Sequence, residues 1–460
     1  MARVSTEQIL HGPLVRTMVR LGWPAMVTSL LQALYNLADA FWIGHLPPET
    51  SGPSVAAIQV SWPVVWLLIS FVAGLSGAAA SALIGQYTGA RRHNDANVAL
   101  TQIFAFLVTA GVAMAAAGFV LAPKLLPLLV TEGAVTEQAS LYIRVIFLGL
   151  PLLGVPFLFQ FALSAYGDTV TPMLVNSTGV ALNLLLDPAL IFGLGPFPSL
   201  GLLGAAIATV ASQGSAAVLA LGVLSRGTKG IRLIPTQLRP RWPWFRKITW
   251  IGLPAAVGQS GTAFGFVVLM AIIGRVPNAT VALAAYGIGD RIFGLLFIAM
   301  HGLGVGLTTI LGQTLGADML ERAWTAVRRG MAFMFALLAV EATVIWLIRA
   351  PLMAAFIPGR EDVIAAGVEF MGIFVWGLPF FGIFVAIESV FRGSGHNVPT
   401  MIMGLARLWA LRVPLCALLG LVWQMGATGV WYGMMVSNVA AAAIALGLFA
   451  TGSWQRKVID

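Results

Sequence analysis

Apolar runs, separated by short polar segments, follow one another along the whole chain. A helix of about 20 apolar residues is long enough to cross the hydrocarbon core of a bilayer. The pattern therefore predicts an all-α membrane protein with twelve transmembrane helices. The first six are expected at 17–44, 54–76, 98–122, 139–165, 171–195 and 201–224, and the second six at 248–275, 280–312, 325–349, 362–392, 398–421 and 427–450. The eighth and tenth runs are longer than a span requires, so we expect those helices to be kinked or to extend beyond the bilayer.

The two halves of the chain repeat each other. The motif LGWPA at Leu21–Ala25 recurs as IGLPA at Ile251–Ala255, and GQYTGA at Gly85–Ala90 recurs as GQTLGA at Gly312–Ala317. The offsets, 230 and 227 residues, are nearly constant, which indicates a duplication. Each half has an even number of predicted spans, so both halves enter the membrane from the same side. Parallel repeats of this kind place a binding site between them, near the middle of the membrane.

The repeats predict three parts of the chain: an N-terminal six-helix bundle at 1–225, a basic cytoplasmic linker at 226–247, and a C-terminal six-helix bundle at 248–460. Hydrophobic residues make up 59% of the chain and charged residues 9%, which is typical of a polytopic membrane protein. Of the 26 Lys and Arg residues, 18 fall on the termini and the even-numbered connections. Basic residues favour the cytoplasmic side. We therefore predict a multi-pass protein of the inner (plasma) membrane with both termini in the cytoplasm, and no nucleic-acid partner.

Four polar residues interrupt the first apolar run. Gln32, Tyr35, Asn36 and Asp39 recur at helical spacing and so share one stripe of the helix. A carboxylate inside a membrane span costs roughly 2.5–3.5 kcal/mol on insertion scales and marks a functional site by default. Asp39 has no basic residue within a helical turn of it. We interpret Asp39 as facing a water-accessible cavity and binding a cation.

A second acid is expected at a similar depth. Counted from the predicted helix ends at about 1.5 Å per residue, Asp39, Asp187 and Thr209 all lie roughly 10–14 Å below the outer surface. Asn183 precedes Asp187 by four residues, so the amide shares a face with the acid. Tyr142, near the outer end of the fourth span, is able to reach the same level. The pattern predicts one cluster of carboxylate, amide and hydroxyl oxygens.

Such a cluster suits either of two cations. Sodium prefers several oxygen ligands, which Asp39, Asp187, Asn183 and Thr209 would supply. A proton is favoured where like-charged, partly desolvated carboxylates raise each other's affinity for it. The residues are compatible with both ions, and a structural hydrogen-bond network is the alternative to ion binding.

The second half differs from the first at the corresponding positions. By the repeat offset, Leu269 corresponds to Asp39 and Leu415 to Asp187. The seventh span offers Gln259 and no carboxylate, so an ion site there is not expected. Glu388 and Arg407 lie on either side of the turn between the tenth and eleventh spans, at distances that allow a salt bridge. We expect a structural pair, with a second polar site lining the cavity as the alternative.

Several segments resemble the multidrug and toxic compound extrusion (MATE) transporters. They are GPLVRTMVRLGWP running into LLQALYNLADAFWIG, the repeated GQYTGA-type turn, YGDTVTPM, and NLLLDPALIFG. The resemblance covers essentially the whole chain, and we place it in the prokaryotic DinF-like branch. It implies two six-helix bundles in a V-shaped MATE fold. It further implies a secondary active multidrug exporter that antiports amphipathic organic cations against H⁺ or Na⁺ by alternating access.

The resemblance also implies roles for single residues. The ion-coupling positions of the N-terminal bundle are matched by Asp39, Asp187, Asn183, Thr209 and Tyr142, with Asn36 beside them. The substrate-cavity lining is matched by Gln32, Tyr35, Asn36, Asp39 and Asn183. We take Pro24 as the point at which the first span kinks. The alternative is a lipid-linked oligosaccharide flippase of the same superfamily, which would need several arginines for a pyrophosphate group.

Enzymatic activity is not expected. The loops are short, the five histidines are scattered, and GVGLTTILGQTLGA lacks the Lys-Ser/Thr ending of a phosphate-binding loop. We therefore predict no cofactor apart from the coupling ion. The expected partners are small organic cations and drugs together with the lipid bilayer, and the protein is expected to be a monomer.

Overall fold

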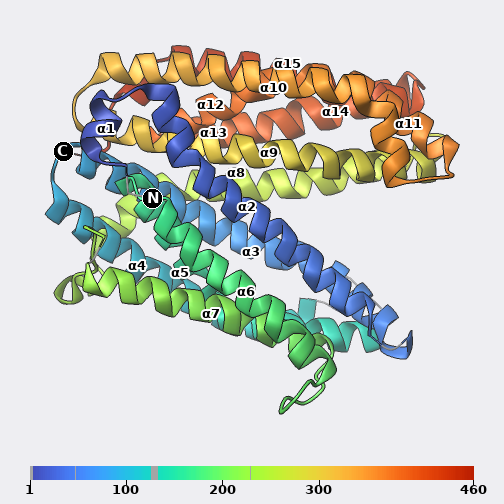
Figure 1. Ribbon diagram of the computed structural model, residues 1–460, viewed down its shortest axis with the longest axis horizontal. Coiled ribbons are helices and arrows are strands. Elements are labelled where there is room, and N and C mark those ends of the chain that lie inside the picture. Colours follow the sequence, from blue (N-terminus) through green and yellow to red (C-terminus); the bar gives the residue numbers. More distant parts are fainter. Residues whose placement is uncertain (1–3, 47, 126–132, 228, 460) are drawn as a thin grey trace. The chain divides into compact units, whose positions relative to one another are not determined.

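The structure is a computed structural model that describes residues 4–46, 48–125, 133–227 and 229–459. Every regular element in these ranges is helical, so the predicted all-α class is confirmed (Figure 1). A short helix, α1 (Thr6–His11), precedes the spans. The helices of the first half are α2 (Leu14–Gly44), α3 (Pro48–Gly89), α4 (His93–Leu125), α5 (Gly133–Tyr166), α6 (Val170–Phe192) and α7 (Leu202–Arg226).

The second half begins with three long helices, continues with two interrupted spans, and ends with one more long helix. The elements are α8 (Trp242–Ile273), α9 (Ala279–Gly316), α10 (Leu320–Phe356), α11 (Glu361–Phe374), α12 (Leu378–Ser394), α13 (Asn397–Leu405), α14 (Val413–Ala417) and α15 (Gly426–Ala450). The predicted kink of the tenth span is confirmed, because a 3-10 turn at Val375–Gly377 separates α11 from α12 just before Pro379. The eighth span is one continuous helix, α9, whose 38 residues exceed the length that a bilayer core requires.

The eleventh span contains two π-helical stretches that the sequence pattern does not predict. They cover Ala406–Arg412 and Leu418–Val422, on either side of α14. Within the described ranges, ten helical segments are long and apolar enough to cross a membrane. These lengths and compositions agree with a multi-pass membrane protein.

The chain folds into two compact units. Unit 1 comprises Met1–Val4 and Pro24–Ala256, and unit 2 comprises Ser5–Trp23 and Val257–Asp460. The boundary between Trp23 and Pro24 lies inside α2, within the repeated motif LGWPA. The boundary between Ala256 and Val257 lies inside α8, just after the motif IGLPA. The division expected at 1–225, 226–247 and 248–460 stays a prediction.

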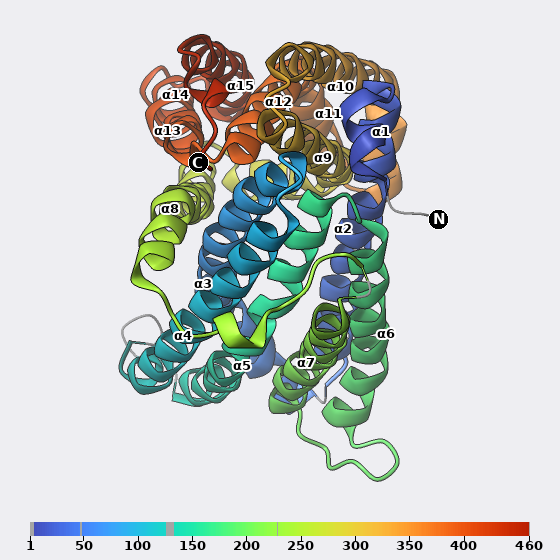
Figure 2. The same ribbon diagram turned by 90° about the vertical axis from the view of Figure 1, so that its left-hand side faces the viewer.

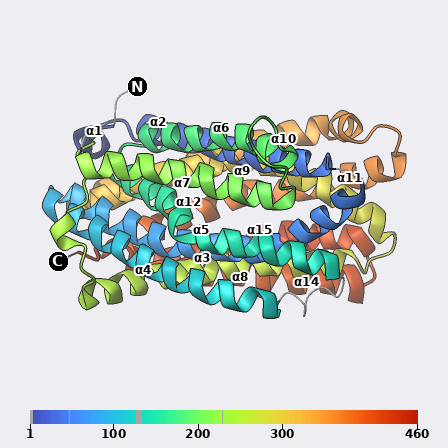
Figure 3. The ribbon, with the colours of Figure 1, turned by 90° about the horizontal axis from the view of Figure 1, so that it is seen from below.

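In unit 1, α5 is the central helix. It packs against α3, α4 and α7, and α6 lies along α7 (Figures 2 and 3). The segment between α7 and α8 is fastened to α4 by Gln102, whose side chain is fully buried. Its amide nitrogen donates to the carbonyl oxygens of Gln237 (2.5 Å) and Arg239 (3.0 Å), and its amide oxygen accepts from the backbone N–H of Arg241 (3.1 Å). The predicted linker is therefore ordered, because one buried side chain satisfies three of its backbone groups.

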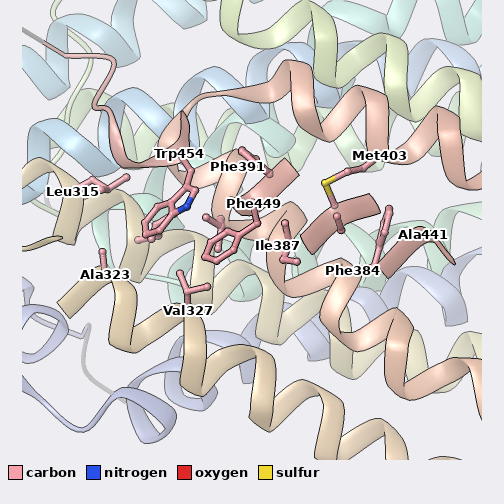
Figure 4. Close-up of a cluster of buried hydrophobic side chains, with 13 residues drawn as sticks. Leu315, Ala323, Val327, Phe384, Ile387, Phe391, Met403, Ala441, Phe449 and Trp454 are labelled. Atoms are coloured by element: carbon pink, nitrogen blue, oxygen red, sulfur yellow. The ribbon is translucent and has the colours of Figure 1, made fainter. Parts of the chain in front are cut away.

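In unit 2, the C-terminal segment completes the hydrophobic core. Trp454 is fully buried and stacks on Phe449 with ring centroids 5.2 Å apart (Figure 4). The ring of Trp324, on α10, meets Trp454 edge-on at 4.9 Å. Phe384, Ile387 and further buried side chains of α12 belong to the same cluster. Aromatic pairs in these geometries contribute beyond the area that they bury.

The sixth span of each repeat is positioned by the same glycine contact. A Cβ atom on Gly204 would lie 2.4 Å from the carbonyl oxygen of Leu190, and one on Gly429 would lie 2.5 Å from that of Leu419. Gly204 lies three residues after Gly201, and Gly429 lies three residues after Gly426; both of these preceding glycines have positive φ. The close approach of two backbones thus requires glycine at the same place in both units.

This contact predicts opposite effects for two Gly→Ala substitutions on α7. Gly222 has open space around the position of a Cβ atom, so Gly222→Ala should stabilise unit 1 by up to about 1 kcal/mol through helix propensity. Gly204→Ala should destabilise it by about 1–3 kcal/mol, because the methyl group forces α6 and α7 apart. Thermal unfolding of the purified protein in detergent measures both. Equal shifts in the same direction would contradict the assignment of Gly204 as a packing contact.

Candidate ion-coupling site

Helix α2 presents two polar side chains to the interior of unit 1. Tyr35 and Asp39 are one turn apart, and Tyr35 is buried while Asp39 is half-buried. The hydroxyl groups of Tyr35 and Thr209 are joined by a hydrogen bond of 2.8 Å, which ties α2 to α7. The Tyr35 hydroxyl also lies within electrostatic range of the Asp39 carboxyl group.

Helix α6 supplies the second acid. Asn183 and Asp187 are fully buried, and the Asn183 amide nitrogen donates to Asp187 Oδ1 at 3.1 Å. Pro188 follows directly inside the helix and cannot donate a backbone hydrogen bond, so a carbonyl one turn earlier loses its helical partner. The spacing of amide and acid predicted from the sequence is thus realised as a direct contact.

The two acids meet. The carboxyl groups of Asp39 and Asp187 lie within hydrogen-bonding reach of each other, and Tyr142 of α5 is buried within electrostatic range of both. Asp39 and Asp187 each lie five residues before the end of their helix, and Thr209 lies seven after the start of α7. At about 1.5 Å per residue, these positions are roughly 8–11 Å inside the helix ends, close to the predicted depth.

Three oxygens of this cluster are buried acceptors without a donor. They are Asp39 Oδ1, Asp187 Oδ2 and Asn183 Oδ1, and among the described residues none donates a hydrogen bond to them. Two carboxylates facing each other have only acceptors to offer, so a bond between them needs a proton on one of them or a cation between them. Leaving such groups buried and unpaired is costly. The donor set, two carboxylates with amide and hydroxyl oxygens, fits a hard monovalent cation or a shared proton.

The remaining predicted cavity residues lie on the same helix but outside this cluster. The Gln32 side chain is exposed, and its amide nitrogen donates to Asn36 Oδ1 at 3.4 Å. Pro24 sits within the uninterrupted helix α2, and its carbonyl oxygen accepts from the Thr28 hydroxyl at 2.9 Å. Tyr35, predicted only as cavity lining, is instead part of the acid cluster. Its spacing of four residues from Asp39 is the signal that would have found it.

In unit 2, the pairing expected for Glu388 is not the one observed. Glu388 forms its salt bridge with Arg392, four residues along the same helix, at 2.6 Å. The Arg407 guanidinium lies instead over the rings of Phe381 and Phe384, with centroid distances of 5.0 and 5.2 Å. A partner four residues along the same helical face is closer than one across a turn.

The other second-half positions follow the prediction more closely. Leu269, the repeat partner of Asp39, is fully buried, and Leu415 is half-buried. Gln259 on α8 is half-buried as well. At the positions given by the repeated motifs, the two acids of unit 1 therefore have apolar counterparts in unit 2.

Long apolar helices built as two repeats, with a buried acid cluster inside one of them, define a multi-pass membrane transporter rather than an enzyme. The model of the MatE family matches residues 24–189 and 254–418, which is well over half of the chain. The chain therefore belongs to the MatE family. The two matched ranges coincide with the two repeats. The placement in the DinF-like branch stays a prediction.

Relatives and solved structures agree with this assignment. The chain is 28% identical to "Probable multidrug resistance protein NorM" of Thermotoga maritima over 96% of its length and 94% of the relative's. It is 26% identical to an "FAD transporter" of Shewanella oneidensis, with 89% of each chain covered. The solved structure "Crystal structure of MATE in complex with MaL6" superposes with a TM-score of 0.88 at 24% identity, covering 97% of this chain and 98% of the other. The twelve-helix MATE fold predicted from the sequence is confirmed.

The Tyr35–Thr209 hydrogen bond is tested by a double-mutant cycle. Tyr35→Phe and Thr209→Val each remove one partner, and the cycle should give a coupling free energy of about 0.5–1.5 kcal/mol in thermal or denaturant unfolding. Thr28→Val, two turns earlier on α2, provides the control cycle with Tyr35→Phe. Its coupling should stay within about 0.5 kcal/mol of zero. Equal coupling in both cycles would show that the α2–α7 bond does not contribute in solution.

Proposed function

We propose that the protein is a secondary active multidrug exporter that antiports amphipathic organic cations against H⁺ or Na⁺. The observation that carries the proposal is the set of buried oxygens of Asp39, Asp187 and Asn183 to which no described residue donates a hydrogen bond. A cation bound among them would offset the cost of burying these acceptors, and no fixed basic group in the cluster competes for the place.

The exchange follows from competition for one negative site. Binding of the coupling ion neutralises Asp39 and Asp187, so a positively charged substrate held by the same carboxylates loses affinity. A ligand shifts a conformational equilibrium only by its difference in affinity for the two states, and neutralisation supplies that difference. The mobile part in this scheme is α2, which bends at Pro24, where the helix lacks one backbone hydrogen bond. The transporter acts as a monomer in the inner membrane with both termini in the cytoplasm.

The names of the relatives support two kinds of substrate. The Thermotoga relative is named for multidrug resistance, which fits a site made of acids. The Shewanella relative is named for a flavin dinucleotide, which carries two phosphates, and the acid cluster of unit 1 would repel such an anion. A lipid-linked oligosaccharide flippase has the same difficulty, because the cluster of Tyr35, Asp39, Tyr142, Asn183, Asp187 and Thr209 contains no base for a pyrophosphate. We therefore propose export of organic cations as the main activity.

Gradient-driven transport tests the proposal directly. In proteoliposomes, the wild type should move a fluorescent organic cation when an opposing H⁺ or Na⁺ gradient is imposed, since a tenfold gradient supplies about 1.4 kcal/mol per ion. Asp39→Asn and Asp187→Asn should lower this rate to that measured without a gradient. Gradient-driven transport by Asp39→Asn at the wild-type rate would refute the coupling role.

The matched control is Asp95→Asn. Asp95 is an acid of the same unit at the start of α4, where it pairs with Arg92 at 2.6 Å. Its variant should transport at the wild-type rate.

Imposing the Na⁺ gradient at equal pH, and then the pH gradient without Na⁺, identifies the coupling ion. Measuring gradient-driven transport of FAD in place of the organic cation tests whether the protein also moves the second kind of substrate.

A further inference from the structure

The eleventh span carries two arginines within one π-helical stretch, Ala406–Arg412. π-Helical turns are rare and are frequently found at functional sites. Arg412 is buried, and its guanidinium donates to Ser437 Oγ at 3.0 Å and to Asn438 Oδ1 at 2.5 Å, so its role is to join this span to α15. Arg407 is held differently.

Arg407 has aromatic rings beneath it and a donor without an acceptor. Its guanidinium lies over Phe381 and Phe384 of α12. Its Nε is buried and, in the part of the chain that the structure describes, has no hydrogen-bond partner. An ionised side chain inside a membrane span is expensive unless it is paired, and it marks a functional site by default. A face of aromatic rings attracts the cation but accepts no N–H bond in the guanidinium plane.

The nearest charges do not neutralise this group. Glu388 is within electrostatic range of Arg407, but its carboxylate is bonded to Arg392. The Nε of Arg392 is also buried without an acceptor among the described residues. His301 of α9 lies within electrostatic range of both Glu388 and Arg392. Arg392 therefore takes the carboxylate of Glu388, and each of the two guanidinium groups retains a donor that no described residue accepts.

The cluster is partly exposed, and aromatic rings lie on one side of it. The side chains of Glu388 and Arg392 are each about a quarter exposed, at 24% and 26%, and His301 is exposed. Phe381 is stacked on Phe384 and also meets Phe297 of α9 at 5.0 Å. Arginine donors beside aromatic rings suit a planar molecule that bears a carboxylate or a phosphate group.

We propose that unit 2 contains an anion subsite, in which Arg407 and Arg392 bind the carboxylate or phosphate of an aromatic transported compound against Phe381. The inference rests on the proposed function for the idea that the ligand is a transported compound. It adds to the proposed cation site of unit 1 a second position, within unit 2, for a negatively charged group of a transported compound. The Glu388–Arg392 pair keeps Glu388 from neutralising Arg407 and so positions the site for an external anion.

A pair of dyes with the same ring system tests the subsite. A cationic xanthene dye is offered as its free carboxylate and as its ethyl ester, and binding is measured by fluorescence with the full-length protein in bilayers of neutral lipid. Neutral lipid ensures that no headgroup supplies a net negative charge. Arg407→Gln should weaken binding of the carboxylate form roughly 10- to 100-fold and leave the ester within about twofold, because only the carboxylate loses a charge-assisted bond.

Two further variants keep the result interpretable. Arg407→Lys retains the charge and should recover part of the affinity for the carboxylate form. Arg349→Gln removes another arginine of unit 2 that lies over an aromatic ring, Trp346 at 4.5 Å, and should change neither dye. Equal weakening of both dyes by Arg407→Gln, or no change in either, would overturn the proposal.

The outcome is separable from the coupling experiment, because equilibrium binding needs no ion gradient. In Asp39→Asn, the ratio of the two dye affinities should remain that of the wild type, since both dyes carry the same cationic ring system. The subsite is supported if Asp39→Asn keeps the wild-type ratio of the two dye affinities while Arg407→Gln does not. This holds even if gradient-driven transport fails. An altered ratio in Asp39→Asn would place the carboxylate recognition in unit 1 and overturn the assignment to Arg407.

Discussion

A charge buried inside a membrane protein has to be paired or hydrogen-bonded, and the two units of this transporter meet that constraint in different ways. In unit 1, Asp39 and Asp187 face each other, and the described residues that interact with them carry amide and hydroxyl groups rather than bases. In unit 2, Arg412 is a resident cation that Ser437 and Asn438 satisfy. An arginine cannot leave, whereas a proton or a sodium ion can. Only the first arrangement is suited to coupling a transport cycle to an ion gradient.

The repeat explains why these two arrangements are comparable. The glycine contacts pair Gly204 with Leu190 in unit 1 and Gly429 with Leu419 in unit 2, so that packing relates residue 190 to residue 419, an offset of 419 − 190 = 229. With the same offset, Arg412 corresponds to Asn183 and Cys416 corresponds to Asp187. The repeated sequence motifs instead relate Asp187 to Leu415, one residue earlier. An arginine and a buried thiol thus stand where the other repeat has an amide and an acid.

The sequence alone predicted the features that depend on local spacing. Helices follow from apolar length, the kink before Pro379 from a span that is too long, and the Asn183–Asp187 contact from four-residue spacing. Two features depend on how the helices pack against one another, and the sequence did not predict them. The hydrogen bond of Tyr35 to Thr209 joins residues 174 positions apart. Glu388 had two arginines within reach, and only packing of the spans shows that Arg392 takes the carboxylate while Arg407 turns to the aromatic rings.

The π-helical stretch of the eleventh span affects which neighbouring helices Arg407 and Arg412 contact. A π turn advances the chain by more residues per turn than an α turn, so it rotates the side chains that follow relative to a regular helix. Within Ala406–Arg412, it places Arg407 and Arg412 on nearly the same face of the helix, where Arg412 bonds to α15 and Arg407 lies over α12. Five residues separate the two, which in an α-helix leaves the second side chain well around the helix from the first. A regular helix would turn one of the two side chains away from its observed neighbours, so the π-helical backbone gives both arginines access to the packed pair of helices α12 and α15.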